Sequence, residues 1–151
     1  MSLDWKEAAR HSHSGFKIVG MDKPWDDDNG EGMHDGVEAY GGISVAHPDD
    51  TPYHNEDLMQ TKRVSHGRMN PHGDDFHGIQ AWLDEDTLNH FVDHPHEIEK
   101  VSEHDPISML HDEDTGDKYL VNGHHRVVAA RYLGKPDSLP ARITSVSRAR
   151  L

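Results

Sequence analysis

The sequence predicts an α+β fold in which a small mixed sheet with packed helices follows a loop-rich, acidic N-terminal extension. Two observations support this prediction. Residues 106–144 follow the order strand, acidic turn, strand, helix and strand, whereas residues 21–52 are rich in Gly, Asp and His and poor in apolar residues. A segment so polar buries too little apolar surface to fold compactly by itself. We therefore divide the chain into an extension over residues 1–78 and a domain over residues 79–151.

The expected elements of the domain are set by short apolar runs and by the residues that begin and end helices. They are a strand over 79–83, a helix over 85–92, strands over 106–111 and 118–121, a helix over 124–133 and a strand over 139–144. Asp84 is a suitable N-cap for the first helix, and Gly134 suits the left-handed end of the second. In the extension we expect a short helix over 3–10, a strand over 16–20 and a short strand or turn of helix over 59–64.

The start of the second helix has the composition of an anion site. Gly123 is followed by His124, His125 and Arg126 at the point where a helix has four N–H groups without intrahelical partners. The helix dipole adds roughly half a positive charge there, so a phosphate is favoured even before a side chain contributes. Arg126 and one or both histidines would add charge-assisted hydrogen bonds.

The charge distribution agrees with an anionic ligand at the C-terminal third. The formal net charge is −13, yet residues 118–151 hold seven of the 15 Lys and Arg residues and one of the 28 Asp and Glu residues. This asymmetry indicates either a phosphate-bearing ligand or association between oppositely charged surfaces. The excess of acid over the rest of the chain disfavours duplex DNA, whose non-specific affinity comes from cationic contacts with phosphate.

Two absences narrow the class of protein. The chain contains no cysteine, which excludes a disulfide framework, a thiolate zinc site and a cysteine nucleophile. It also contains no run of 18 apolar residues, so we expect no membrane association and a cytoplasmic location.

The order of elements around Gly123-His-His-Arg-Val-Val-Ala-Ala130, with the strand Pro140-Ala-Arg-Ile143 after it, resembles the ParB/sulfiredoxin superfamily over about residues 79–146. In sulfiredoxins the helix begins Gly-Cys-His-Arg, and the cysteine is the catalytic residue. His124 occupies that position here, so the resemblance does not imply sulfiredoxin activity. In ParB-type proteins Gly-x-x-Arg helps to bind CTP, and Gly123 and Arg126 keep this pattern. Other relatives are nucleases or nucleotide-dependent kinases of free serine.

The resemblance implies a nucleotide-binding domain, with a phosphotransferase or a nuclease as the enzyme classes that fit. The ligand would be a nucleoside triphosphate or diphosphate, ATP or CTP, with Mg²⁺ if a reaction occurs. His124 either acts as a general acid or base near neutral pH or replaces a lost catalytic group. The expected ligand-binding residues are Asn122, Gly123, His124, His125, Arg126 and Arg142, the last of these pointing at the phosphates or at solvent.

The 15 histidines raise the question of a metal site. His90 and His94 are four residues apart on an expected helix and His96 follows, which is a spacing that metal ligands use. No third and fourth ligands accompany them in a recognisable motif, so we favour surface histidines and predict no metal site.

The alternative function is a structural or interaction protein that uses the same fold. Such a protein would belong to a larger assembly, for example a phage particle, and its acidic N-terminal half would contact protein partners. Its location would then be the virion if it is phage-encoded, and otherwise the cytoplasm.

Overall fold

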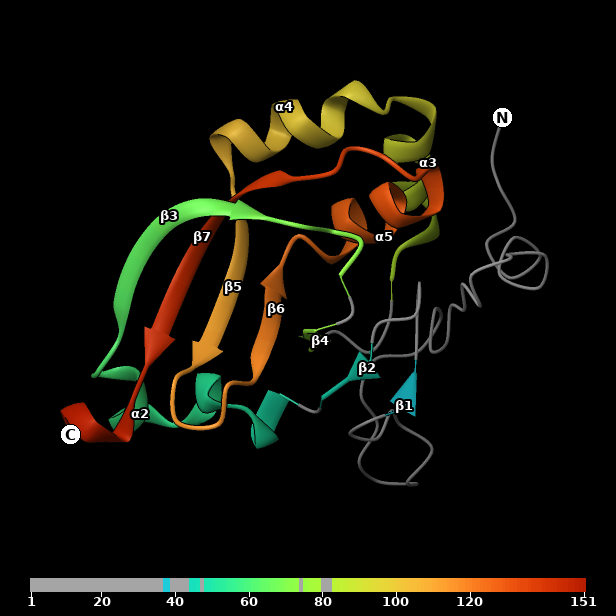
Figure 1. The fold of residues 1–151 in the computed structure, drawn as a ribbon. Helices are drawn as coiled ribbons and strands as arrows, with labels where there is room; N and C mark the ends of the chain where they lie inside the picture. Colours follow the sequence, from blue (N-terminus) through green and yellow to red (C-terminus); the bar gives the residue numbers. More distant parts are fainter. Residues whose placement is uncertain (1–36, 39–43, 47, 74, 80–82) are drawn as a thin grey trace.

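A computed structural model describes residues 37–38, 44–46, 48–73, 75–79 and 83–151 of the chain (Figure 1). The helix expected over 3–10 and the strand expected over 16–20 lie outside these residues. No helix in the described part of the chain combines the length and the apolar character needed to cross a membrane.

The fold is α+β, as the sequence predicts, and is built around a mixed seven-stranded sheet of order β1-β2-β4-β6-β5-β7-β3. The three pairs β2/β4, β4/β6 and β5/β7 are parallel, and the other pairs are antiparallel. The strands are β1 (Val37–Glu38), β2 (Ser44–Val45), β3 (Arg63–Met69), β4 (His77–Gly78), β5 (Ile107–Asp112), β6 (Lys118–Asn122) and β7 (Leu139–Val146).

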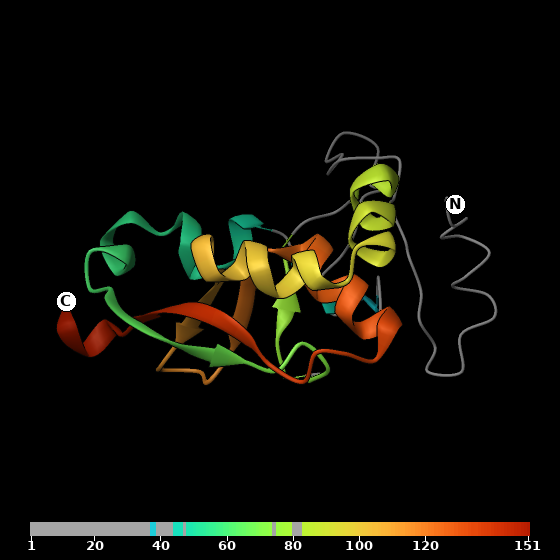
Figure 2. The ribbon, with the colours of Figure 1, turned by 90° about the horizontal axis from the view of Figure 1, so that it is seen from above.

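The helices gather at the two ends of the strands. Near one end lie α3 (Glu85–Asp93), α4 (His96–His104) and α5 (His124–Leu133), and near the other end lies α2 (Glu56–Met59), close to the C-terminus (Figure 1). Figure 2 shows α4 running beside β7 and β3. Three short 3-10 helices complete the described elements: η1 (Pro48–Asp50), η2 (Pro52–His54) and η3 (Arg148–Arg150).

Most elements expected for residues 84–144 are confirmed, and their ends follow local chemistry. The Asp84 side chain accepts a hydrogen bond from the Thr87 N–H at 3.0 Å, which caps the start of α3. Gly134 ends α5 with a φ of 76°, a left-handed conformation that glycine adopts without a steric penalty. Gly116, with a φ of 80°, closes the acidic turn between β5 and β6.

Most of the strand expected over 79–83 lies outside the described residues, at 80–82. Its two ends, Ile79 and Leu83, are not in a strand; the Ile79 N–H donates to the His124 side chain, and the nearby strand is the two-residue β4. Helix α4 was not expected. It begins directly after Pro95, a residue tolerated at helix starts, and buries Ile98 on its inner face.

The sheet also extends further toward the N-terminus than residue 79, where the sequence predicts the start of the domain. Strand β3 pairs with β7 over its whole length, from Arg63 opposite Ser145 to Met69 opposite Leu139. Residues 63–69 are therefore part of the same sheet as β7, and the boundary at residue 79 stays a prediction. The sequence predicts only a short strand or turn of helix over 59–64 here, because just two of the seven residues of β3, Val64 and Met69, are large and apolar.

The core lies on both faces of β5. Met109 belongs to a large cluster, and the adjacent Leu110 belongs to a smaller one. Successive side chains of a strand point to opposite faces, so both faces of β5 are covered. Fully buried members of the large cluster include Leu88, Ile98, Ile107, Val127 and Leu139, and the smaller cluster contains Leu58, Tyr119 and Val146.

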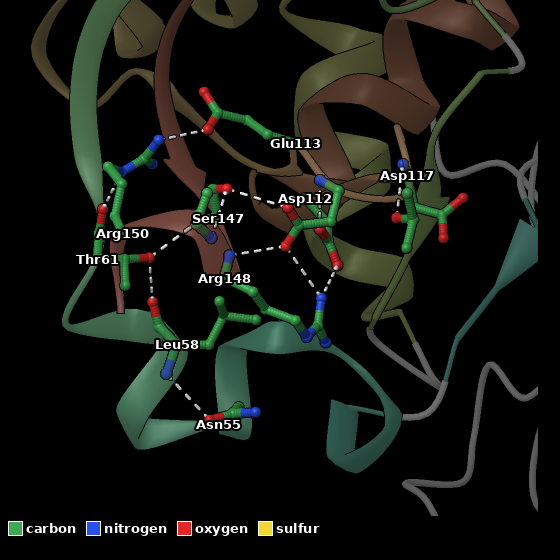
Figure 3. A network of polar contacts seen from close by, with 12 residues as sticks. Asn55, Leu58, Thr61, Asp112, Glu113, Asp117, Ser147, Arg148 and Arg150 are labelled. Carbon is green, nitrogen blue, oxygen red and sulfur yellow. Dashed lines mark hydrogen bonds and ion pairs between the residues drawn. The ribbon is translucent and has the colours of Figure 1, made fainter.

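A group of polar residues, the C-terminal clasp of Ser147, Arg148 and Arg150, fastens the end of the chain to the β5–β6 turn and to the segment after α2 (Figure 3). The Arg150 guanidinium donates to the Thr61 carbonyl at 3.0 Å and forms an ion pair with Glu113. Ser147 and Arg148 both bind the Asp114 carboxylate, at 3.0 and 3.1 Å. The clasp closes the end of the sheet opposite to α5.

Candidate functional site

The expected anion site begins at Gly123, which is buried and has a φ of 101°. Only glycine adopts this left-handed conformation readily. A Cβ atom added at Gly123 would lie 2.5 Å from Cδ1 of Ile107, which is fully buried. Gly123 is therefore required by the backbone turn and by the close approach of β5, whether or not a ligand binds.

His124, the expected catalytic residue, is buried with 2% of its surface exposed. Its Nε2 accepts a hydrogen bond from the Ile79 N–H at 3.1 Å. Burial and then the neighbouring His125 lower the pKa of His124 to about 3, against a smaller opposing effect of a hydrogen bond with the Leu120 backbone. The imidazole is thus neutral at physiological pH, and its hydrogen bond holds Ile79 against the start of α5. This environment does not fit a general acid or base working near neutral pH.

His125 holds the other end of the same segment. Its Nε2 accepts a hydrogen bond from the Asp84 N–H at 2.8 Å, and burial lowers its pKa while the Asp84 carboxylate opposes that shift. The two histidines therefore bind backbone groups at positions 79 and 84. The connection between β4 and α3 is fixed at both ends to the first turn of α5.

Arg126 points into the protein. Its Nη1 donates to the Ser102 hydroxyl at 2.9 Å and to the Asp105 carbonyl, and its Nη2 lies 3.4 Å from the Asp105 carboxylate. Only 6% of the side chain is exposed, and burial lowers the pKa of the guanidinium although Asp105 opposes this. Because Asp105 is the C-cap of α4, Arg126 joins the start of α5 to the end of α4.

The three cationic or titratable side chains expected on a phosphate thus bind protein groups instead. Helix N-termini with neighbouring His and Arg are compatible with an anion site, and the same residue types also serve to fix loops and helix ends. In this chain the internal use accounts for His124 and Arg126. That their side chains also hold phosphate stays a prediction.

The remaining two expected residues are exposed, and the sheet brings them together. In the register of the sheet, Ser108 of β5 is opposite Asn122 of β6 on one side and opposite Arg142 of β7 on the other. Arg142 is in turn opposite His66 of β3. Asn122, Arg142 and His66 are exposed, and Ser108 is half-buried. We call Asn122, Ser108 and Arg142 the polar row; it ends at Gly123, the N-cap of α5.

Ser108 is a member of the row that the sequence analysis did not identify. No local signal marks it, because its position depends on how β5 pairs with two other strands. The same is true of Ser102 and Asp105, the partners of Arg126, which lie 24 and 21 residues before it in the chain.

Two hollows on the described surface lie elsewhere. One, of about 680 Å³, is polar and is bounded by η1, η2, α2, the β5–β6 turn and Arg148. The other, of about 380 Å³, has an apolar floor of Met69, Phe76, Met109 and Ile143. Neither is lined by residues 122–126 or by Arg142.

The histidines near α3 are close to each other. The ring centroids of His90 and His94 are 5.0 Å apart, and those of His94 and His96 are 6.3 Å apart. In the part of the chain that the structure describes, no three His, Cys, Asp or Glu side chains are grouped so that they could hold a metal ion.

Comparisons with protein-family models, with curated proteins and with solved structures found no match to this chain.

Proposed function

We propose that this chain binds the phosphate groups of a nucleotide along the polar row, next to the first turn of α5. The observation that carries the proposal is the strand register that places Asn122, Ser108 and Arg142 side by side across three strands. The row provides an amide, a hydroxyl and a guanidinium, all of which donate hydrogen bonds to phosphate oxygens. The resemblance to the ParB/sulfiredoxin superfamily favours a nucleotide as the source of the phosphate.

The dimensions of the row suit more than one phosphate. Neighbouring strands lie about 4.8 Å apart, so the backbones of Asn122 and Arg142 are separated by about 10 Å across β5. Arg142 is exposed and long, and its planar guanidinium can form two parallel hydrogen bonds with one phosphate. The dipole of α5 would stabilise the negative charge at the Asn122 end of the row.

The proposal concerns binding and extends to a reaction only with further groups. A phosphotransferase or a nuclease would use Mg²⁺ bound to the nucleotide and a general base. The buried, neutral His124 is unsuitable as that base because its Nε2 is already occupied by the Ile79 N–H.

Calorimetric titration of the purified chain with ATP, ADP and CTP, each with Mg²⁺, tests the proposal. Arg142→Gln should weaken binding about tenfold or more, because a bidentate charge-assisted contact is lost. Arg63→Gln is the matched control. It makes the same charge change at an exposed arginine, the first residue of β3, which is opposite Ser145 and three pairs away from Arg142 along the strands. The proposal fails if the wild type releases no heat with all three nucleotides, or if both variants bind like the wild type.

A second candidate function is that of an interaction protein. The inward direction of His124 and Arg126 favours it, because these side chains stabilise the fold without needing a ligand. A blank titration with every nucleotide, together with saturable binding of a protein segment, would favour this second candidate over the first.

A further inference from the structure

Strand β3 forms one edge of the sheet. Its seven residues pair with β7 on one side, and in the described part of the chain it has no strand on its other side (Figure 1). Along such an edge, alternate residues direct their N–H and C=O groups away from the sheet. Six of the seven residues, from Arg63 to Arg68, are exposed. The strand contains no proline, so each residue keeps a backbone donor.

This edge is basic in an acidic protein. Strands β3 and β7 together carry Arg63, Arg68 and Arg142 and no Asp or Glu, whereas the chain as a whole has 28 acidic and 15 basic residues. Arg68 is held in place by Ser138, with Nε donating to the hydroxyl at 2.7 Å and Nη2 to the carbonyl at 3.1 Å. Its charge is therefore presented at a fixed position beside the edge.

The charge selects between two ways of extending the sheet. Pairing of β3 with β3 of a second copy would place two basic strands side by side, and like charges on neighbouring strands are destabilising. Positive charge on an edge strand is indeed a common protection against self-association. The same charges attract an acidic strand, so they oppose one partner and favour the other.

We propose that β3 binds an extended, acidic segment of a partner protein, which adds to the sheet as a further strand. The backbone groups of β3 supply the hydrogen bonds, while Arg63, Arg68 and the neighbouring Arg142 supply charge complementarity. Val64, with 40% of its surface exposed, offers an apolar contact on the same strand. This inference gives the second candidate function a surface and a partner, and it rests on that function, not on nucleotide binding.

The test uses the full chain and two acetylated peptides as long as β3, with the repeats Glu-Glu-Thr and Lys-Lys-Thr. These repeats place charge on both faces of the added strand, as Arg63 and Arg68 lie on opposite faces of β3. Hydrogen exchange followed by mass spectrometry should detect added protection in residues 63–69 with the acidic peptide and none with the lysine peptide. Arg63→Glu should lower the affinity for the acidic peptide about tenfold at low salt. Lys100→Glu, the same charge change at an exposed position of α4, should leave its affinity unchanged.

Three results would overturn the inference: no binding of the acidic peptide, protection that appears away from β3, or equal effects of Arg63→Glu and Lys100→Glu. Self-association of the wild type that Arg63→Glu abolishes would also overturn it, because the edge would then bind a second copy. A nucleotide titration of Arg63→Glu separates the two proposals, since loss of peptide binding with unchanged nucleotide binding concerns the edge alone. Matching circular dichroism spectra show that the variants are folded.

Discussion

The first turn of α5 and the β3/β7 edge both carry positive charge, and they use it differently. At the first turn, Arg126 is buried, and its Nη1 donates to the Ser102 hydroxyl and the Asp105 carbonyl. On the strand pair β3/β7, Arg63 and Arg142 are exposed. A buried guanidinium has lost its hydration and depends on its protein partners, whereas an exposed one remains available to a ligand. Burial therefore separates the arginines that stabilise this fold from those that can recognise another molecule.

The comparison also changes the meaning of the sequence Gly123-His-His-Arg126. Its residues fix the β4–α3 connection, the end of α4 and the start of β5 to a single helical turn. A turn that joins three elements is expected to tolerate few substitutions. The exposed strands nearby are expected to tolerate many without loss of stability.

The largest expected effect is that of Arg126→Ala. It leaves the Ser102 hydroxyl and the Asp105 carbonyl without their donor and opens a cavity between α4 and α5, which together lower the free energy of unfolding by roughly 4 kcal/mol. The ion pair itself contributes little to this loss, because 64% of the Asp105 side chain is exposed. Urea unfolding followed by circular dichroism measures the change. A loss below about 1 kcal/mol, as for a surface residue, would contradict the internal role of Arg126.

The second largest effect is expected for Gly123→Ala. The left-handed backbone and the contact with Ile107 should together lower the free energy of unfolding by about 3 kcal/mol. Gly134→Ala is the matched control, since it has a φ of 76° but an added Cβ would meet no atom within 4 Å. Gly134→Ala should lower the free energy of unfolding by about 1 kcal/mol, from the left-handed backbone alone. Equal losses for the two variants would mean that the approach of β5 to Gly123 is not tight.

The third effect concerns pH. The pKa of His124 is about 3 in the folded chain and 6.5 ordinarily, so the unfolded chain binds more protons and stability falls as pH drops below about 6.5. Between pH 7 and pH 5, His124 should lower the free energy of unfolding by about 2 kcal/mol. His124→Gln should remove most of this loss, while His96→Gln, at an exposed histidine, should not. An unchanged pH dependence in His124→Gln would contradict the prediction.

The smallest effect is expected on β7. Arg142→Ala should change the free energy of unfolding by less than about 0.5 kcal/mol, because its side chain is exposed on β7. The same urea titration measures it. A loss comparable to that of Arg126→Ala would mean that Arg142 also serves the fold, and the distinction between the two regions would disappear.

Features that depend on neighbouring residues could be predicted from the sequence. The cap at Asp84, the left-handed Gly134, the acidic turn and the extent of α5 all follow from local backbone chemistry, and the α+β class follows from their order. Helix α4 was missed because only two of its nine residues, Ile98 and Val101, are apolar, so its composition is that of an exposed connection.

Features that depend on distant residues could not be predicted. The directions of His124 and Arg126 are decided by Ile79, Ser102 and Asp105, between 21 and 45 residues away. The meeting of Asn122 and Arg142 requires the register of three strands. Residue type and spacing therefore identified the helix start correctly, but they could not decide whether its side chains point to a ligand or into the protein.

The central claim, that the first turn of α5 is used internally, is tested most directly by the imidazole of His124. A nitrogen-15 NMR titration of the histidine side chains, with the His124 signal assigned from His124→Gln, would follow its protonation with and without inorganic phosphate. We predict that the His124 signal stays that of a neutral ring from pH 8 to pH 5 and does not respond to phosphate. Titration of this signal near pH 6.5, with a shift on addition of phosphate, would contradict it.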